Sequence, residues 1–164
     1  RIGMVYGPDD PNEHRLVPSV ISAFLRGQAP VLSSGRRRCD WVYVGDVAQA
    51  LLQAATLRRI DEPSFDVGSG RLTSIRRVVE LIRSHLGAPL DPVFSDELDR
   101  PNEQERCADA DKTFRVTGWR AQTSLTEGLL RTIAWHKRVA IDESSASALV
   151  PQFDNRSSRA RPPL

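Results

Sequence analysis

The sequence predicts an α/β fold in which short strands alternate with helices. Short apolar runs bounded by Gly, Pro, Asp or Ser are typical of strands, and they occur at residues 2–6, 29–44, 64–70 and 91–95. Segments whose apolar residues recur at helical spacing lie at residues 16–27, 47–59, 75–87, 109–118 and 124–139. The strands are too few for a complete doubly wound domain, so we expect half of a larger fold.

The first strand supports the same expectation. Residues 2–6 are apolar on nearly successive positions, which is typical of a strand covered on both faces, as in a parallel sheet. Such a strand normally has neighbours encoded before it. We therefore interpret the opening "RIGMVYGPDD" as a cut through a larger fold.

Capping residues support the helices and set their expected limits. Pro18 suits the first turn of helix 16–27, Gly27 ends that helix, and Asp46 is the expected N-cap of helix 47–59. The later helix ends are marked by Thr73 or Ser74 with Gly87, by Asp109 with Gly118, and by the capping box Ser124-Leu125-Thr126-Glu127. The strands in 29–44 are expected to form a hairpin about a Ser-Gly-Arg turn.

Two domain regions follow from the pattern. Residues 1–141 are expected to form one globular unit, and residues 142–164, which are mostly Ser, Ala, Pro and Arg without a period, to form a disordered tail. The 23 basic and 21 acidic side chains of this 164-residue chain leave a net charge of +2, too small to indicate nucleic acid. Binding of nucleic acid through the basic tail is the weakest alternative.

Composition also bears on location and on metal binding. No apolar run approaches the roughly 20 residues that a membrane helix needs, and no signal peptide is visible. Cys39 and Cys107 lack CxxC spacing, which argues against a metal site or a disulfide framework. We expect a cytoplasmic protein without a membrane partner.

Redox signatures are missing from the 164 residues. Neither tyrosine, Tyr6 nor Tyr43, is followed four residues later by Lys, so no Tyr-x-x-x-Lys pair exists for acid/base work. The sequence Gly68-Ser69-Gly70 lacks the third glycine of a dinucleotide loop, and we interpret it as a plain strand-to-helix turn. We therefore predict no catalytic residue in this chain.

An ordered series of motifs resembles the extended short-chain dehydrogenase/reductase family, which includes NAD-dependent sugar-nucleotide epimerases, dehydratases and reductases. The series is "RIGMVYGP", "HRLVP", "SSGRRRCDWVYVGDVAQA", "FDVGSGRLTS", "RPNEQERCADADK" and "TGWRAQTSLTEGLL". It covers residues 1 to about 138 and matches only the second half of the family, a Rossmann-type fold whose first half binds the cofactor. The resemblance implies NAD or NADP as the cofactor of the full-length enzyme.

The resemblance also implies substrate-binding residues. Arg15 and Arg100 match basic positions that contact a diphosphate, a role suited to the bidentate guanidinium. Leu16, Val31 and Leu32 match residues near the nucleotide. These apolar positions could equally be ordinary core.

Two positions depart from the family pattern. Cys39 stands where the family has a phosphate-binding Arg, and a thiol cannot replace that group. Arg37 is the better substitute than Arg38, because alternation along a strand puts Arg37 on the face of Cys39. Gly3 and Met4 match the strand end that faces cofactor and substrate, where the family usually has Asn. We expect no nucleophilic role for Cys39, since no His is nearby in the sequence.

The first functional hypothesis is the nucleotide-sugar-binding, C-terminal portion of such an enzyme, inactive by itself. The alternative is a non-catalytic truncated binding or interaction module of the same family. The expected partner is a nucleotide-diphosphate sugar, and the resemblance allows a homodimer of the full-length protein. The sequence leaves open the sugar, the nucleotide, the reaction and the choice between NAD and NADP.

Overall fold

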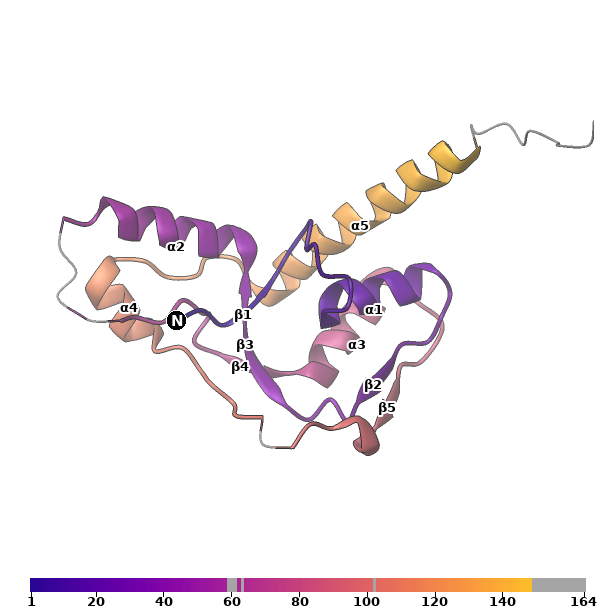
Figure 1. Ribbon diagram of the computed structural model, residues 1–164, viewed down its shortest axis with the longest axis horizontal. Coiled ribbons are helices and arrows are strands. Elements are labelled where there is room, and N and C mark those ends of the chain that lie inside the picture. Colours follow the sequence, from indigo (N-terminus) through magenta and orange to yellow (C-terminus); the bar gives the residue numbers. More distant parts are fainter. Residues whose placement is uncertain (59–61, 63, 102, 149–164) are drawn as a thin grey trace, which may run out of the picture.

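The computed structural model describes residues 1–58, 62, 64–101 and 103–148. In chain order the elements are β1 (Met4–Tyr6), α1 (Leu16–Leu25), β2 (Val31–Ser33), β3 (Arg38–Tyr43), α2 (Val44–Thr56), β4 (Leu72–Ser74), α3 (Ile75–Leu86), β5 (Val93–Ser95), the 3₁₀ turn η1 (Asp96–Leu98), α4 (Ala110–Thr117) and α5 (Leu125–Ala148). Strands and helices alternate as predicted. Helices α1, α3 and α5 lie on one side of β1, β3 and β4, with α2 and α4 on the other (Figure 1).

The strands form two small sheets. In one sheet β1 pairs in parallel with β3, which pairs in antiparallel fashion with β4. In the other, β2 pairs in parallel with β5. The predicted strand at 64–70 is reduced to a single parallel bridge between Ile2 and Val67.

The predicted hairpin between β2 and β3 is wrong, because these two strands belong to different sheets. The connecting residues are bound elsewhere. The backbone N–H of Ser34 donates to the Asp99 carboxylate (2.9 Å), and the Gly35 carbonyl accepts from the Arg76 N–H (2.9 Å). These long-range bonds direct the chain away from a local turn.

Two apolar clusters lie on the two sides of β1. Helices α1, α3 and α5 bury one cluster against the sheet, and its fully buried members include Val20, Ile21, Val78, Val79, Ile82 and Leu129. The second cluster lies under α2 and contains Val42, Val47, Ala50, Val67 and Trp119. Because Met4 packs against the first cluster and Val5 against the second, β1 is covered on both faces, as predicted.

The predicted caps are largely confirmed. The Ser74 hydroxyl accepts from the Arg77 N–H, the Asp109 carboxylate from the Lys112 N–H, and the Ser124 hydroxyl from the Glu127 N–H. Gly87 and Gly118 end α3 and α4 in the left-handed conformation, with φ of 65° and 72°.

Helices α2 and α5 differ from prediction in their limits, and α2 ends at Thr56 instead of residue 59. Helix α2 begins at Val44, so Asp46 lies inside its first turn, where the carboxylate accepts from the N–H and hydroxyl of Thr123 (2.9 and 3.1 Å). Helix α5 continues to Ala148, beyond the predicted end near Val139, and includes the first residues of the predicted tail. An established helix propagates with one hydrogen bond per added residue and needs no apolar stripe. Residues 149–164 lie outside the described residues.

Candidate functional site: an arginine-lined groove

A groove of about 790 Å³ lies between the start of α1, strands β2 and β3, and the segment after η1. Eight of the nine sequence-predicted site residues line it: Met4, Arg15, Leu16, Val31, Leu32, Arg37, Cys39 and Arg100. The ninth, Gly3, lines a different pocket, where a Cβ would approach the Asp40 carbonyl oxygen to 2.7 Å. Gly3 therefore permits close backbone packing.

Arg15 stands at the entrance to α1 and is held by two partners. Its Nη1 pairs with the Asp10 carboxylate at 3.1 Å, and its Nη2 donates to the Val5 carbonyl at 2.7 Å. The same Nη2 lies 3.8 Å from the Met4 sulfur. With 38% of its side chain exposed, the Arg15 guanidinium is fixed in place yet accessible from the groove.

Arg37 and Cys39 line the groove together, and Arg38 does not. Arg36 also lines the groove, and Arg37 lies just before β3, so alternation along a strand does not by itself account for these positions. Arg37 Nη1 pairs with Glu103 at 3.0 Å, while Arg38 donates to Glu105 from Nε (3.0 Å), Nη2 (2.7 Å) and its backbone N–H (2.8 Å).

The Cys39 thiol is a poor candidate for a nucleophile. Burial raises its pKa above the ordinary value, and the positive charge of Arg37 offsets this only in part. A thiol in this state is protonated near neutral pH.

The segment after η1 closes one side of the groove with carboxylates. Asp99 accepts hydrogen bonds from Ser34. These bonds, and to a lesser extent the nearby Arg36, hold the pKa of the Asp99 carboxyl below its usual range. Arg100 is exposed and forms no ion pair with any residue that the structure describes.

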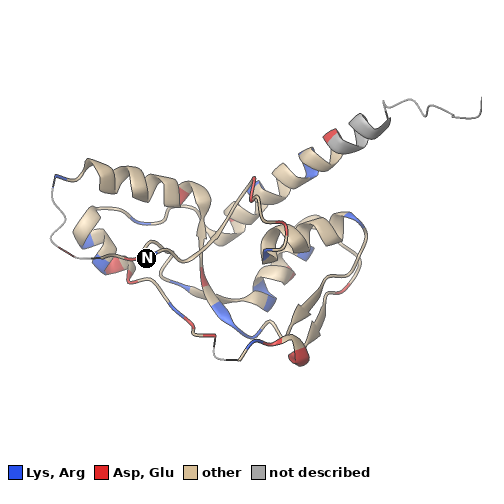
Figure 2. Cartoon of the chain, viewed as in Figure 1, with Lys and Arg blue, Asp and Glu red and all other residues tan. Residues whose placement is uncertain are grey.

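Sequence reasoning missed the acidic side of this groove. Asp99, Glu103 and Glu105 lie in a stretch interpreted as a polar connection, yet all three face arginines of the segment 36–38. Figure 2 shows acidic residues after η1 beside the basic residues at the start of β3. The only signal in the sequence is the alternation of Glu with Arg in "DRPNEQER".

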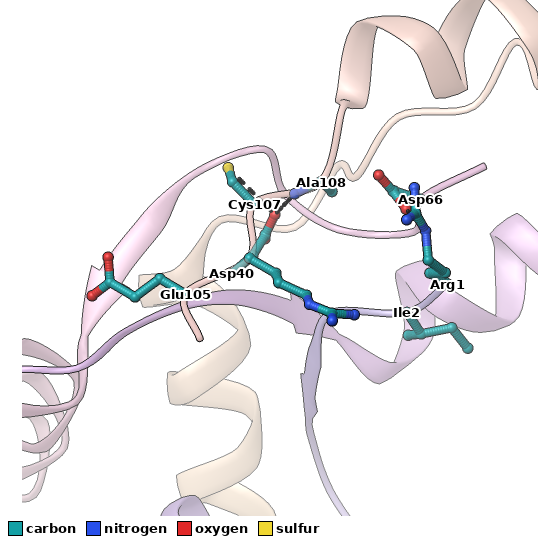
Figure 3. A pocket seen from close by; sticks show the side chains of 9 residues that line it. Arg1, Ile2, Asp40, Asp66, Glu105, Cys107 and Ala108 are labelled. Atoms are coloured by element: carbon teal, nitrogen blue, oxygen red, sulfur yellow. Dashed lines mark hydrogen bonds and ion pairs between the residues drawn. The ribbon is translucent and has the colours of Figure 1, made fainter. Parts of the chain in front are cut away.

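Asp40 is one of the residues that line a second pocket of about 430 Å³ (Figure 3). This buried carboxylate accepts from the backbone N–H of Ser69 (2.7 Å), Gly70 (3.0 Å) and Ala108 (2.9 Å), and from the Ser69 hydroxyl (2.6 Å). The amides of the Gly68-Ser69-Gly70 turn are thus bound by a carboxylate of the chain itself. This geometry agrees with the interpretation of that sequence as a structural turn.

Among the described residues there is no candidate metal site and no candidate membrane-spanning helix. Within residues 1–58, 62, 64–101 and 103–148, no group of three His, Cys, Asp or Glu side chains could hold a metal ion. Across the same residues, no helix combines the length and the apolar character that crossing a membrane requires.

The fold and the groove define an α/β protein with a groove lined by arginines and carboxylates. Residues 1–68 match the model of the NAD dependent epimerase/dehydratase family. A putative UDP-glucose 4-epimerase of Methanocaldococcus jannaschii is 30% identical over 142 residues, which are 84% of this chain and 44% of that protein.

Solved structures agree with this match. The UDP-glucose 4-epimerase of Thermotoga maritima with UDP-glucose superposes with a TM-score of 0.76 at 29% identity, over 85% of this chain and 45% of that one. MoeE5 in complex with UDP-glucuronic acid and NAD gives a TM-score of 0.75 at 29% identity, over 85% of this chain and 46% of the MoeE5 chain. The chain is similar to proteins of the NAD-dependent epimerase/dehydratase family, matches the C-terminal part of their Rossmann-type fold, and spans less than half the length of these relatives.

The family is NAD dependent, and the Gly68-Ser69-Gly70 turn of this chain does not fit the cofactor's diphosphate. Its glycine pair at Gly68 and Gly70 has no space for a phosphate, because a Cβ on Gly68 would already lie 2.7 Å from the Asp40 carboxylate. The amides that could receive a phosphate donate to Asp40 instead.

Proposed function

We propose that this chain is the nucleotide-sugar-binding portion of an NAD(P)-dependent sugar-nucleotide epimerase, dehydratase or reductase, and that the chain alone does not catalyse the reaction. One observation carries the proposal: eight residues predicted to lie at the substrate or cofactor site, from five separate parts of the sequence, line one groove. Its volume of about 790 Å³ falls within the range of roughly 300 to 1,000 Å³ usual for ligand pockets.

The groove offers the chemistry that a nucleotide diphosphate requires. Arg15, Arg37 and Arg100 supply guanidinium groups for phosphate oxygens. Val31 is 65% exposed and, with Leu32, offers apolar surface for a nucleotide base. In the relatives described above, UDP-sugars are the ligands named, which supports the same class of ligand here.

The exposed face of α2 supports the view that more protein completes the enzyme. Val44, Leu51 and Leu52 are 40%, 55% and 70% exposed, although the opposite face of the same helix is packed in the second apolar cluster. A helix that is apolar on both sides is normally buried on both. Hydride chemistry would then be performed by groups outside this chain, with NAD(P) as the redox partner.

The alternative, a non-catalytic binding module, is favoured by Cys39 and Met4. Both stand at positions where the family usually has polar contacts to substrate, and neither a buried thiol nor a thioether replaces them. The two hypotheses differ in the gene upstream of Arg1. An in-frame G-x-x-G-x-x-G strand and a Y-x-x-x-K helix would support the hypothesis of an enzyme. The absence of both would support the hypothesis of a binding module.

Calorimetric titration of the full 164-residue chain with UDP-glucose tests the binding function. Arg100→Gln should weaken binding about 10- to 100-fold, because a charge-assisted hydrogen bond contributes about 1.5–3 kcal/mol. Arg83→Gln is the matched control, since Arg83 pairs with Asp91 at the end of α3 and does not line the groove.

Two outcomes would count against the proposal. If the Arg100→Gln and Arg83→Gln variants bound UDP-glucose with equal affinity, the groove would not be the binding site. Turnover of UDP-glucose by the isolated chain with NAD would show that its catalytic groups are not missing.

A further inference from the structure

Arg37 leaves much of its hydrogen-bonding capacity unused. Its Nη1 makes a single ion pair with Glu103 at 3.0 Å, and its Nε is buried without a hydrogen-bond partner among the described residues. An end-on contact of this kind is weaker than the bidentate pairing of which a guanidinium is capable. The environment therefore leaves Arg37 with unused binding capacity.

Glu103 differs from the other two carboxylates on this side of the groove. Glu105 receives three hydrogen bonds from Arg38, and Asp99 is bound by Ser34 and lies 3.7 Å from Arg36. Glu103, in contrast, has Arg37 as its one ion-pair partner in the described part of the chain. Both side chains of the pair are 31% exposed, so either can separate from the other into solvent.

The other three arginines of the groove do not depend on Glu103. Arg15 is paired with Asp10, Arg36 with Asp96 and Asp99, and Arg100 forms no ion pair with the described residues. Asp99 is also held by Ser34, so among the described carboxylates of the segment after η1 that pair with a groove arginine, Glu103 is the one with a single partner. The contact between Arg37 and Glu103 is thus the point at which a ligand anion can displace a carboxylate most readily.

We propose that Glu103 is the resident counter-ion of Arg37 and sets the anion affinity of the groove: an anionic ligand group must displace the Glu103 carboxylate to reach the Arg37 guanidinium. This inference rests on the proposed function and names the residue that tunes its ligand preference. A singly charged ligand that only replaces Glu103 gains little, because it exchanges one ion pair for another. A diphosphate offsets the displacement, since its remaining oxygens are available to Arg15 or Arg100.

Removing the carboxylate at residue 103 tests this directly. Inorganic pyrophosphate and UDP-glucose are titrated at low salt into the full chain, its Glu103→Gln and Arg37→Gln variants, and the double variant. Glu103→Gln should bind pyrophosphate about two- to fivefold more tightly, the range expected when a partly exposed ion pair no longer competes. The double variant should show no gain over Arg37→Gln alone.

A control separates this effect from a general change in charge. Glu80→Gln also removes one negative charge, but Glu80 pairs with Arg77 at 3.9 Å on α3, outside the groove. This variant should bind pyrophosphate as the wild type does. Circular dichroism and thermal unfolding verify that each variant folds.

The two ligands distinguish the possible failures. Unchanged or weaker pyrophosphate binding by Glu103→Gln overturns the role of Glu103, even if UDP-glucose binds. A gain for pyrophosphate without any UDP-glucose binding retains that role and refutes the nucleotide-sugar function. Failure of every variant to bind either ligand refutes both.

Discussion

The buried Asp40 carboxylate offers the sharpest test of how this fold is held together. Asp40 has 2% of its surface exposed and joins three segments that are distant in sequence: β3, the turn after Val67 and the chain before α4 (Figure 3). Replacing Asp40 with Asn keeps the size of the side chain but exchanges one carboxylate oxygen for an amide group. That amide donates hydrogen bonds, and it would face N–H groups that also donate.

The structure sets the size of the effect. Asp40 Oδ1 accepts hydrogen bonds from the N–H and hydroxyl of Ser69, and Oδ2 accepts from the N–H groups of Gly70 and Ala108 and from the Cys107 thiol. An Asn amide group at Oδ1 loses the bond to the Ser69 N–H, and at Oδ2 it loses the bonds to the Gly70 and Ala108 N–H groups; the Ser69 hydroxyl can accept as well as donate. One or two lost hydrogen bonds to a charged acceptor cost about 1.5–6 kcal/mol in all. That is a large share of the roughly 5–15 kcal/mol by which domains are stable.

Urea-induced unfolding, followed by the fluorescence of the buried Trp41 and Trp119, measures this cost as a change in the free energy of unfolding. Asp96→Asn is the control, because Asp96 is 71% exposed and its pair with Arg36 lies at the surface. The control should lose less than about 1 kcal/mol. If Asp40→Asn lost no more stability than the Asp96→Asn control, the hydrogen bonds of Asp40 would not be what holds these segments together.

Two further predictions concern titratable groups. Burial lowers the pKa of His136 below 6.5, so the unfolded chain binds the proton more readily, and the free energy of unfolding should fall as the pH drops from about 6.5. Urea unfolding at a series of pH values measures this dependence, and His136→Gln should make it flatter. An unchanged dependence of the free energy of unfolding on pH in that variant would contradict the prediction. Iodoacetamide should label the exposed Cys107 of the native chain well before the buried Cys39, and equal rates by peptide mass spectrometry would contradict the burial of Cys39.

The groove shows how far a single sequence leads. Its arginines were expected from motif order, and Arg37 was chosen over Arg38 because side chains alternate along a strand. Their counter-ions were not expected. Glu103 lies 66 positions beyond Arg37, and nothing local in a polar stretch says which cation a carboxylate will meet.

The errors in the predicted fold have the same origin. β2 and β3 are close in sequence, and the turn between them suggested a hairpin. The structure instead pairs β2 with β5, some sixty residues later. Strand pairing depends on which apolar faces are buried together, and that is a property of the whole chain.

The sequence by itself determined the α/β class and most helix limits, because caps, glycine C-termini and apolar spacing act over a few residues. The order of its motifs, through the resemblance to a family, indicated eight of the residues that gather in the groove. Only the tertiary structure decided which strands pair, that Asp40 occupies the amides of the Gly68-Ser69-Gly70 turn, and that Glu103 neutralises Arg37. These contacts join segments tens of residues apart. Their energies depend on burial and distance, which a local pattern does not encode.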